Sequence, residues 1–167
     1  MPLNIRGLGT AQPEQTVNQT ESTELSEWVS ADSEERASLV RRIQRRSQVH
    51  TRGSVLLTGD AKQTIRQRLP FYGANSPSTA KRMEVFRLHA TSLAIRACKR
   101  ALAESAIPTG SITHLITISC TGFHAPGVDC DLIDQLQLPL STQRTHVGFM
   151  GCHAALNGLR VAHAFIE

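Results

Sequence analysis

The stretch that decides the fold is Arg144-Thr-His-Val-Gly-Phe-Met-Gly-Cys-His-Ala-Ala-Leu-Asn-Gly-Leu-Arg160. It opens as an extended, β-leaning run that ends at Phe149, and Gly151 then supplies a flexible turn residue. Beyond the turn, apolar residues recur at the spacing of one helical face: Ala155, Leu159, Ala162 and Ile166. The sequence therefore predicts that Cys152 lies where a strand turns into a helix.

Cys152 at this junction is a candidate acyl-accepting nucleophile. Unpaired N–H groups and the positive end of the dipole at a helix start favour a thiolate. A small residue before a nucleophile on a sharp strand–turn–helix also presents the side chain to a substrate. The alternative is a buried thiol that acts as a small hydrophobe, which is the commoner role of a free cysteine. A phosphate-cradling turn is a weaker third hypothesis, because Gly148 and Gly151 do not fit G-x-G-x-x-G.

Length and composition describe one globular domain or part of a larger one. The chain has 167 residues, of which 40% are hydrophobic and 19% charged, and this excludes bulk disorder. Its net charge of +4 fits a phosphorylated small molecule, an acidic carrier or nucleic acid, whereas 4% aromatics argue against a base-stacking platform. The four cysteines have neither C-x-x-C nor zinc spacing, so no metal site is expected. Without an apolar leader or spanning run, we expect a cytoplasmic protein that does not enter the membrane.

The pattern along the chain predicts alternating strands and helices. The expected strands cover residues 3–10, 49–57, 112–119 and the run before Cys152. The expected helices cover residues 23–29, a segment capped by Asp32 with Glu35 in a capping box, residues 79–105, residues 128–138 and the segment after Cys152. Residues 59–78 are expected to form a long irregular loop. This order indicates an α/β layered fold.

The helix capped by Asp32 carries the strongest electrostatic feature of the sequence. Helical spacing stacks Arg42 on Arg46 and Arg41 on Arg45. Such a cluster can clamp phosphates, for instance those of coenzyme A, because guanidinium matches phosphate bidentately. It can also contact nucleic acid, or simply be a solvated helix face. The residues alone leave these three interpretations open.

A second motif, Cys120-Thr-Gly-Phe-His-Ala-Pro-Gly127, directly follows the predicted strand at residues 112–119. It is a turn-rich run of small and polar residues. Such positions at the carboxyl end of a strand commonly line ligand crevices in α/β sheets.

Two runs, Cys120-Thr-Gly-Phe-His-Ala-Pro-Gly-Val-Asp129 and Gly148–Arg160, closely resemble motifs of type III polyketide synthases. These are the chalcone and stilbene synthase-like enzymes, and the match is nearer to bacterial members. Gly7-Leu-Gly-Thr-Ala-Gln-Pro13 and Ile112-Thr-His-Leu-Ile116 support it, so the resemblance spans nearly the whole chain. It implies a thiolase-like fold, in which residues 1–167 are the N-terminal half-domain, a mixed sheet flanked by helices, and the C-terminal half is absent.

The resemblance implies an acyltransferase of polyketide biosynthesis. In the family, the nucleophilic cysteine takes an acyl group from an acyl-CoA. Malonyl-CoA is then decarboxylated, and the resulting carbanion attacks the thioester. Both coenzyme A thioesters are substrates, and no permanently bound cofactor is implied. A homodimer is implied, with neither nucleic acid nor membrane as a partner.

Carried over residue by residue, the resemblance implies that Cys152 is the nucleophile. Cys120 and Thr121 fall where the family lines its chain-elongation cavity, and Phe149 is assigned to the same substrate pocket. Ala125, before Pro126, matches a loop that reaches toward the partner subunit's cavity, often with a cis bond.

The same comparison implies that Arg42 and Arg46 contact coenzyme A phosphates. A third basic position of the family corresponds to Leu39, so this clamp is expected to be weaker or differently built.

The family's catalytic histidine and asparagine correspond to positions beyond Glu167. His153 is no substitute, because adjacent helical side chains diverge. We therefore expect decarboxylation of malonyl-CoA near background for residues 1–167 alone. The apolar helix after Cys152 is expected to expose an apolar face, so this fragment should self-associate or exist only beside the missing C-terminal half as its partner. Alternatives are a ketoacyl-carrier-protein synthase III-like enzyme, a nucleic-acid-binding module and a non-catalytic half-domain partner.

Overall fold

The chain forms two compact units, each described here by itself. The computed structural model describes residues 3–73 and 76–167. One unit consists of Met1–Ala11 and Thr79–Glu167, and we call it the cysteine unit because it contains Cys152. The other consists of Gln12–Ser78, and we call it the arginine unit. That residues 1–167 act as a single half-domain stays a prediction.

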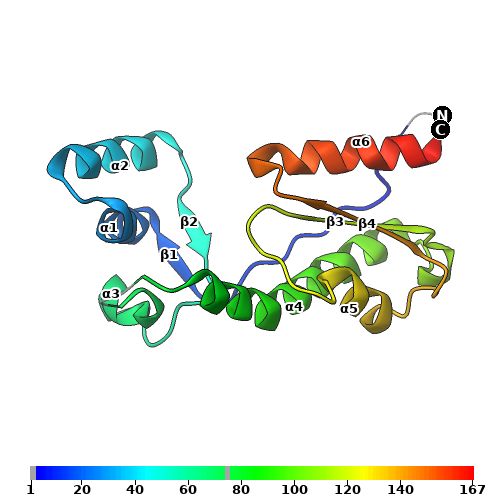
Figure 1. Cartoon of the computed structure of the whole chain (residues 1–167), viewed down its shortest axis with the longest axis horizontal. Coiled ribbons are helices and arrows are strands. Elements are labelled where there is room, and N and C mark those ends of the chain that lie inside the picture. The colour runs from blue at the N-terminus through cyan, green and yellow to red at the C-terminus, as the bar shows by residue number, and fades with distance from the viewer. Residues whose placement is uncertain (1–2, 74–75) are drawn as a thin grey trace. The chain divides into compact units, whose positions relative to one another are not determined.

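The arginine unit combines small helices with an antiparallel pair of short strands (Figure 1). Its elements are β1 (Thr16–Asn18), α1 (Gln19–Ser30), α2 (Glu34–Arg46), β2 (Thr51–Gly53), α3 (Ile65–Arg68) and a 3₁₀ turn at Pro70–Tyr72. β1 pairs with β2, and Val17 lies opposite Arg52. The core of the unit is a buried apolar cluster of Val17, Leu57, Ile65 and Leu69.

The start of α2 differs from the predicted one by one residue. Ser33, not Asp32, is the N-cap, and its hydroxyl accepts from the backbone N–H of Arg36 at 3.3 Å. Asp32 instead pairs with the guanidinium of Arg36 at 2.8 Å. The predicted capping box with Glu35 is therefore wrong, because the N3 position after Ser33 is Arg36.

The predicted loop at residues 59–78 contains α3, which the sequence prediction missed. Thr64 caps this helix, and Gln67 completes a capping box that pairs with the backbone of Thr64. The predicted strand at residues 49–57 is also shorter, because only Thr51–Gly53 pairs with β1.

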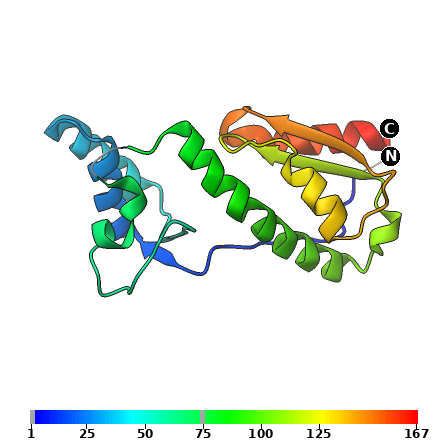
Figure 2. The ribbon, with the colours of Figure 1, turned by 60° about the horizontal axis from the view of Figure 1, so that its bottom comes forward.

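The cysteine unit is a strand pair between helices. Its elements are α4 (Thr79–Ser105), β3 (His114–Ser119), α5 (Val128–Gln135), β4 (Gln143–Gly148) and α6 (Ala154–Ile166), with 3₁₀ turns at Thr109–Ser111 and Gly151–His153. β3 and β4 are parallel, in a register that runs from His114 opposite Gln143 to Ser119 opposite Gly148. Figures 1 and 2 show α4 and α5 on one face of this pair and α6 on the other. The predicted bounds of α4 are confirmed, whereas α5 ends before the predicted residue 138.

The core of this unit lies between the strands, α4 and α5, around buried Leu132, Leu136 and Leu138. On the opposite face, α6 approaches β3 closely, because a Cβ on Gly158 would lie 2.3 Å from Cδ1 of Ile118. β3 is nevertheless only half-buried, with Ile118 41% exposed. The prediction of a buried strand is therefore wrong for this chain, since α6 covers that face only in part.

The segment from Leu3 to Thr10 pairs with no strand of the described residues, so the predicted strand is wrong. Its backbone bonds to side chains of α4: Leu8 N–H donates to Glu104 at 2.9 Å, and Arg100 donates to the carbonyl of Thr10 at 2.5 Å. Gly9 permits this approach, because a Cβ there would lie 2.0 Å from the carbonyl oxygen of Ala97. Among the described residues, no helix has both the length and the apolar character needed to span a bilayer.

Candidate active site

Cys152 lies in the 3₁₀ turn Gly151–His153, between β4 and α6, and its side chain is exposed. The predicted strand–turn–helix junction is therefore confirmed. The chain reverses through two left-handed residues, Phe149 with φ 58° and Gly151 with φ 71°. Glycine adopts such angles without steric cost, whereas Phe149 does so at a cost. No described side chain caps the start of α6, where the backbone N–H of Ala154 donates to the carbonyl of Gly151. The positive end of the α6 dipole therefore lies close in sequence to the thiol.

The two sequence motifs meet at the carboxyl ends of the parallel strands. The backbone N–H of Phe149, after β4, donates to the carbonyl of Ser119, the last residue of β3, at 3.3 Å. The ring of Phe149 contacts that of Phe123 edge-on, with 5.7 Å between centroids. Both rings remain largely exposed, at 72% and 48%. This edge of the sheet is where α/β folds commonly place a ligand site.

The loop after β3 is fixed at Gly122 by a close contact with α4 and by a hydrogen bond to Ser119. A Cβ on Gly122 would lie 2.1 Å from the ring of Phe86 on α4, so a larger residue at position 122 would require this ring to move. The hydroxyl of Ser119 accepts from the N–H of Gly122 at 3.2 Å. Cys120 and Thr121, just before this point, are exposed. That these two residues line a chain-elongation cavity stays a prediction.

Ala125 is exposed in the same loop and precedes Pro126 through a cis peptide bond. The cis bond agrees with the geometry implied by the family resemblance. The contact of this loop with a partner subunit stays a prediction.

A cavity of about 560 Å³ lies behind this loop, between α4, β3 and α5. Its wall includes Phe86, Cys98, Thr117, His124 and His146, but none of the site residues predicted from the sequence. Nδ1 of His124 is buried there without a hydrogen-bond partner in the described part of the chain. Sequence reasoning missed this cavity, although the small-residue row Ala90, Ala94 and Ala97 on α4 was a signal for it.

The other cysteines of the unit differ from Cys152 in their surroundings. Cys98 is partly buried on α4, and burial raises the pKa of its thiol. The sulfur of Cys130 accepts a hydrogen bond from the guanidinium of Arg144 at 2.7 Å. Within residues 3–73 and 76–167, no group of three or more His, Cys, Asp or Glu side chains is placed to hold a metal ion.

The arginines on α2 divide into paired and unpaired residues. Arg36 pairs with Asp32, and Arg41 pairs with Glu27 at 3.0 Å and with Glu34. The hydrogen bond to Glu34 raises the pKa of Arg41 above its ordinary value. Arg42, Arg45 and Arg46 are exposed, and none of them has a carboxylate partner in the part of the chain that the structure describes.

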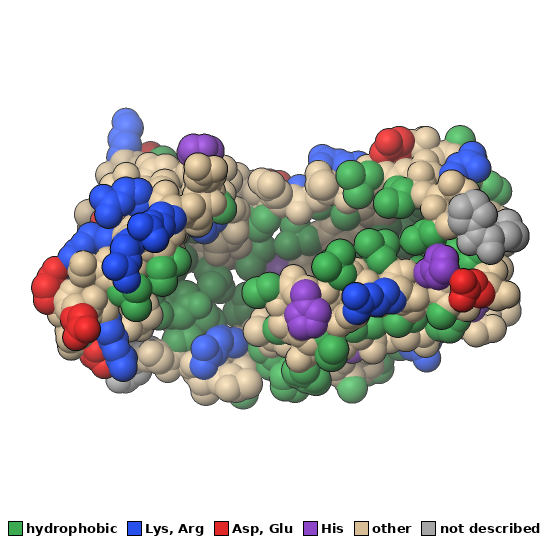
Figure 3. Space-filling view, turned by 90° about the horizontal axis from the view of Figure 1, so that it is seen from above, with side chains coloured by type: hydrophobic (Ala, Val, Ile, Leu, Met, Phe, Trp, Pro, Cys, Tyr) green, Lys and Arg blue, Asp and Glu red, His purple; other side chains and the backbone are tan. Residues whose placement is uncertain are grey.

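Arg42 and Leu39 line a shallow cavity of about 520 Å³ beside α2. Figure 3 shows Lys and Arg side chains gathered over the end of the arginine unit that carries this helix. Arg42 and Arg46 thus meet two requirements for binding phosphate, exposure and the lack of an intramolecular carboxylate. That they bind coenzyme A phosphates stays a prediction.

The fold and the exposed thiol define an α/β protein with a cysteine at a strand–helix junction. Comparison with known proteins identifies the family. Residues 2–167 match the model of the chalcone and stilbene synthases, N-terminal domain, and the chain belongs to this family. The alpha-pyrone synthesis polyketide synthase-like Pks18 of Mycobacterium tuberculosis is 34% identical over 164 residues, which are 98% of this chain and 40% of that protein. The bisdemethoxycurcumin synthase of Oryza sativa is 30% identical over 171 residues, again 98% and 40%.

A solved structure shows the same fold. The C-terminal type III polyketide synthase domain of Steely1 from Dictyostelium superposes with a TM-score of 0.76 at 28% identity, over 96% of this chain and 43% of that one. The predicted thiolase-like α/β fold, N-terminal half, is therefore confirmed. The chain spans about 40% of the length of the curated relatives it matches.

Proposed function

We propose that this chain is the nucleophile-bearing half of a type III polyketide synthase that condenses an acyl-CoA starter with malonyl-CoA. The observation that carries the proposal is the exposed thiol of Cys152 at the uncapped start of α6. The family match over residues 2–167 supports the assignment of this thiol as the acyl-accepting nucleophile. Coenzyme A thioesters enter as substrates, and the proposal includes no permanently bound cofactor.

In the proposed first step, the Cys152 thiolate attacks the carbonyl carbon of the acyl-CoA thioester. A new carbon–sulfur bond forms on Cys152, the bond to coenzyme A breaks, and the departing thiolate takes a proton from solvent. The positive end of the α6 dipole stabilises the attacking thiolate. The acyl group is then held as a thioester on Cys152, at the edge of the sheet where the rings of Phe123 and Phe149 are in contact.

In the second step, malonyl-CoA loses carbon dioxide, and the resulting carbanion attacks the carbonyl of the Cys152 thioester. The carbon–carbon bond forms as the bond to sulfur breaks, which regenerates the thiolate. We assign support for decarboxylation to a histidine and an asparagine of a second half of the fold, because His153 diverges from Cys152. Cys120, Thr121 and Phe149 are proposed to line the pocket for the growing chain.

The proposed substrate clamp is Arg42 with Arg46, which are exposed and one helical turn apart. Leu39 beside them offers apolar surface where the family has a third basic residue. A cytoplasmic homodimer, in which the loop at Ala125 reaches toward the partner subunit, belongs to the same proposal, and the exposure of Ala125 supports it.

The decisive experiment is acylation of the purified protein by hexanoyl-CoA, followed by intact-protein mass spectrometry. We expect one acyl adduct that maps to Cys152 and is lost in Cys152→Ala. Cys98→Ala, which removes a thiol away from the junction, is the matched control and keeps the adduct. An adduct retained by Cys152→Ala would refute the assignment, and no adduct on the wild type would favour a non-catalytic half-domain.

A second measurement tests the clamp. Arg42→Ala and Arg46→Ala each raise the hexanoyl-CoA concentration for half-maximal acylation about tenfold, because each loses a charge-assisted contact to phosphate. Arg36→Ala is the control, since Arg36 is already paired with Asp32. Release of carbon dioxide from malonyl-CoA by residues 1–167 alone is expected to stay near background.

A further inference from the structure

The cavity of about 560 Å³ in the cysteine unit has apolar walls and one polar end. Ala90, Ala94 and Ala97 follow each other at helical spacing on α4, so their methyl groups form one flat side of the cavity. Other walls come from β3 and α5, and Figure 2 shows α4 and α5 on the same side of β3. Folded interiors hold few voids larger than a water molecule, so a cavity of this size requires an explanation.

The polar end of the cavity is a pair of side chains on neighbouring strands. Oγ1 of Thr117 on β3 and Nδ1 of His146 on β4 are hydrogen-bonded at 2.9 Å, and both residues line the cavity. This bond occupies only one nitrogen of the imidazole, and Nε2 of His146 has no partner among the described residues. Because His146 is exposed, the pair lies at the rim, where Nε2 can meet a ligand.

His124 adds a second nitrogen that the described part of the protein does not use. Its Nδ1 is buried without a hydrogen-bond partner, and its ring meets that of Phe86 edge-on with 5.9 Å between centroids. The terminal torsion of a histidine is broad and roughly two-fold, so a half-turn of the ring can bring Nδ1 to its other edge. A buried polar atom without a partner costs free energy, so a ligand that satisfies Nδ1 gains affinity.

The charges around the cavity disfavour an ionised ligand. Asp129 lines the cavity, but its carboxylate is already paired with the guanidinium of Arg144 at 2.8 Å. An ammonium group would therefore find this carboxylate neutralised. Among the described residues that line the cavity there is no lysine or arginine, so a carboxylate or phosphate would lose its water without gaining a cation.

We propose that this cavity binds a neutral aromatic ring that carries a hydroxyl group, that is, a phenol. The ring lies against the flat alanine side of α4, and the rings of Phe86 and Phe123 on the wall favour an aromatic body over an aliphatic one. The hydroxyl pairs with Nε2 of His146, and because a hydroxyl both donates and accepts, it suits either tautomer of the imidazole. The inference goes beyond the proposed function, since Cys152 does not line this cavity.

The test compares three probes that share one body and differ in a single group: para-propylphenol, propylbenzene and para-propylbenzoate. Their binding to the purified protein is measured by isothermal titration calorimetry. We expect para-propylphenol to bind about tenfold more tightly than propylbenzene, because only the phenol forms the hydrogen bond. The benzoate should bind more weakly than the phenol, because its charge finds no cation. Equal affinity for the phenol and propylbenzene, or tighter binding of the benzoate, would overturn the proposal.

Two variants test the place of binding. Ala90→Leu fills the cavity and should weaken the binding of para-propylphenol about tenfold, whereas Ala103→Leu, at an exposed alanine of the same helix outside the cavity, should not. His146→Phe keeps a ring but removes Nε2, so the preference for the phenol over propylbenzene should disappear. His89→Phe, on α4 outside the cavity, is its control. Because His146 is exposed, its variant carries the test even if Ala90→Leu fails to fold, and an unchanged preference in His146→Phe would overturn the assignment.

A second readout locates the ligand and separates this inference from the proposed function. Cys98 lines the cavity, so saturating para-propylphenol should slow its modification by methyl methanethiosulfonate and leave that of exposed Cys120 unchanged. Unchanged labelling of Cys98 would overturn the assignment. Cys152→Ala should keep wild-type affinity for the phenol. Phenol binding without acylation by hexanoyl-CoA would refute the proposed function alone, and acylation without phenol binding would refute this inference alone.

Discussion

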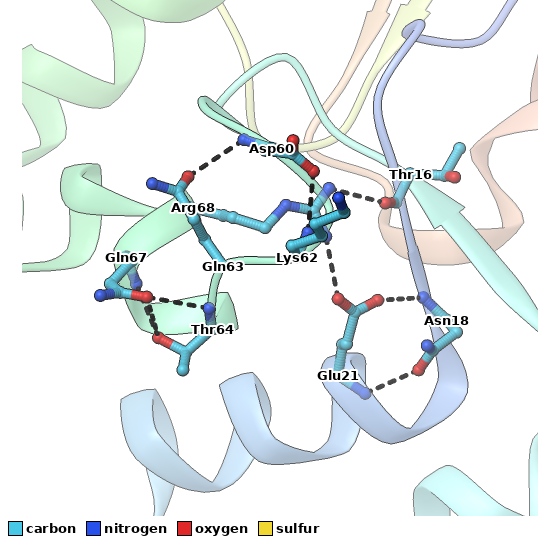
Figure 4. Close-up of polar contacts among 9 residues, drawn as sticks. All are labelled: Thr16, Asn18, Glu21, Asp60, Lys62, Gln63, Thr64, Gln67 and Arg68. Atoms are coloured by element: carbon cyan, nitrogen blue, oxygen red, sulfur yellow. Dashed lines mark hydrogen bonds and ion pairs between the residues drawn. The ribbon is translucent and has the colours of Figure 1, made fainter.

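Arg68 on α3 donates through Nη1 to Oε1 of Glu21, in the first turn of α1, at 2.9 Å (Figure 4). The Arg68 side chain is only 4% exposed, and its Nη2 donates to the carbonyl of Thr16 at 3.1 Å. The other carboxylate oxygen of Glu21 accepts from the N–H of Asn18 at 2.8 Å, which completes the capping box of α1. One carboxylate therefore both caps a helix and neutralises a buried guanidinium.

Removal of this charge should destabilise the arginine unit. Glu21→Gln keeps an acceptor for the capping box but leaves Arg68 buried without a counter-charge, so we expect a loss of about 3 kcal/mol in the free energy of unfolding. Urea denaturation followed by circular dichroism measures it. Asp32→Asn, in the exposed pair with Arg36, is the control and should cost less than about 0.5 kcal/mol. Equal losses in the two variants would contradict a special role for the buried pair.

Gly9 is predicted to be essential for the contact of the N-terminal segment with α4. A Cβ at Gly9 would meet the backbone carbonyl of Ala97, which cannot move aside as a flexible side chain can. Gly9→Ala should therefore cost about 1–3 kcal/mol in thermal or urea unfolding. Gly110→Ala is the matched control, because no atom lies within 4 Å of a Cβ at that position. If both alanine variants unfold alike, the segment does not depend on this approach.

Stability at alkaline pH should depend on Cys98. Because burial raises the pKa of Cys98 above its ordinary value of 9.0, the folded protein holds this proton more tightly than the unfolded chain does. The resulting stabilisation is complete below pH 9.0 and is lost as the pH rises through the folded-state pKa. Urea midpoints measured on both sides of that pH should fall more steeply for the wild type than for Cys98→Ala. Parallel slopes would show that Cys98 ionises as freely in the folded protein as in the unfolded chain.

Thiol reactivity should rank the cysteines. Iodoacetamide near neutral pH is expected to label Cys152 first, because its thiol is exposed beside the start of a helix, and Cys98 last, because burial disfavours its thiolate. Peptide mass spectrometry over a time course gives the order. Cys120, which is exposed but lies after a strand, is the internal comparison. Faster labelling of Cys120 than of Cys152 would count against thiolate activation by α6.

The sequence predicted correctly those helices and strands whose formation depends on the local spacing of apolar residues and on turn residues. The apolar stripe of α4 and the strand–helix junction at Cys152 are local features, and both were predictable. Strand pairing at residues 3–10 was not, because a β-leaning run becomes a strand only if a neighbouring strand accepts its backbone. Here Glu104 and Arg100 bind that backbone instead. The four-residue α3 was too short for periodicity, although Thr64 and Gln67 form its capping box.

For the candidate site too, the sequence predicted local features but not the contacts between distant segments. Both motifs were predicted to follow strands, but their meeting at one edge of the sheet was not predicted. The contact between Phe123 and Phe149 depends further on the parallel register of β3 and β4 and on the left-handed backbone of Phe149, which the sequence does not specify. The cavity at Phe86 and His124 lies between α4 and the loop after β3, two segments that are far apart in the sequence. Its detection required tertiary structure.

The exposed face of α6 should make the 167-residue chain self-associate. Leu156, Leu159 and Ile166 fall on one side of this helix and are 60%, 45% and 41% exposed, a concentration of apolar surface that favours association in water. Sedimentation velocity at increasing protein concentration should show a rising mean mass. Leu156→Glu should weaken association about tenfold, because it places a charge inside the contact. Leu140→Glu introduces the same charge at a leucine 96% exposed outside α6, so it should leave association unchanged. A wild-type protein that stays monomeric at every concentration would show that the exposed face of α6 does not drive self-association.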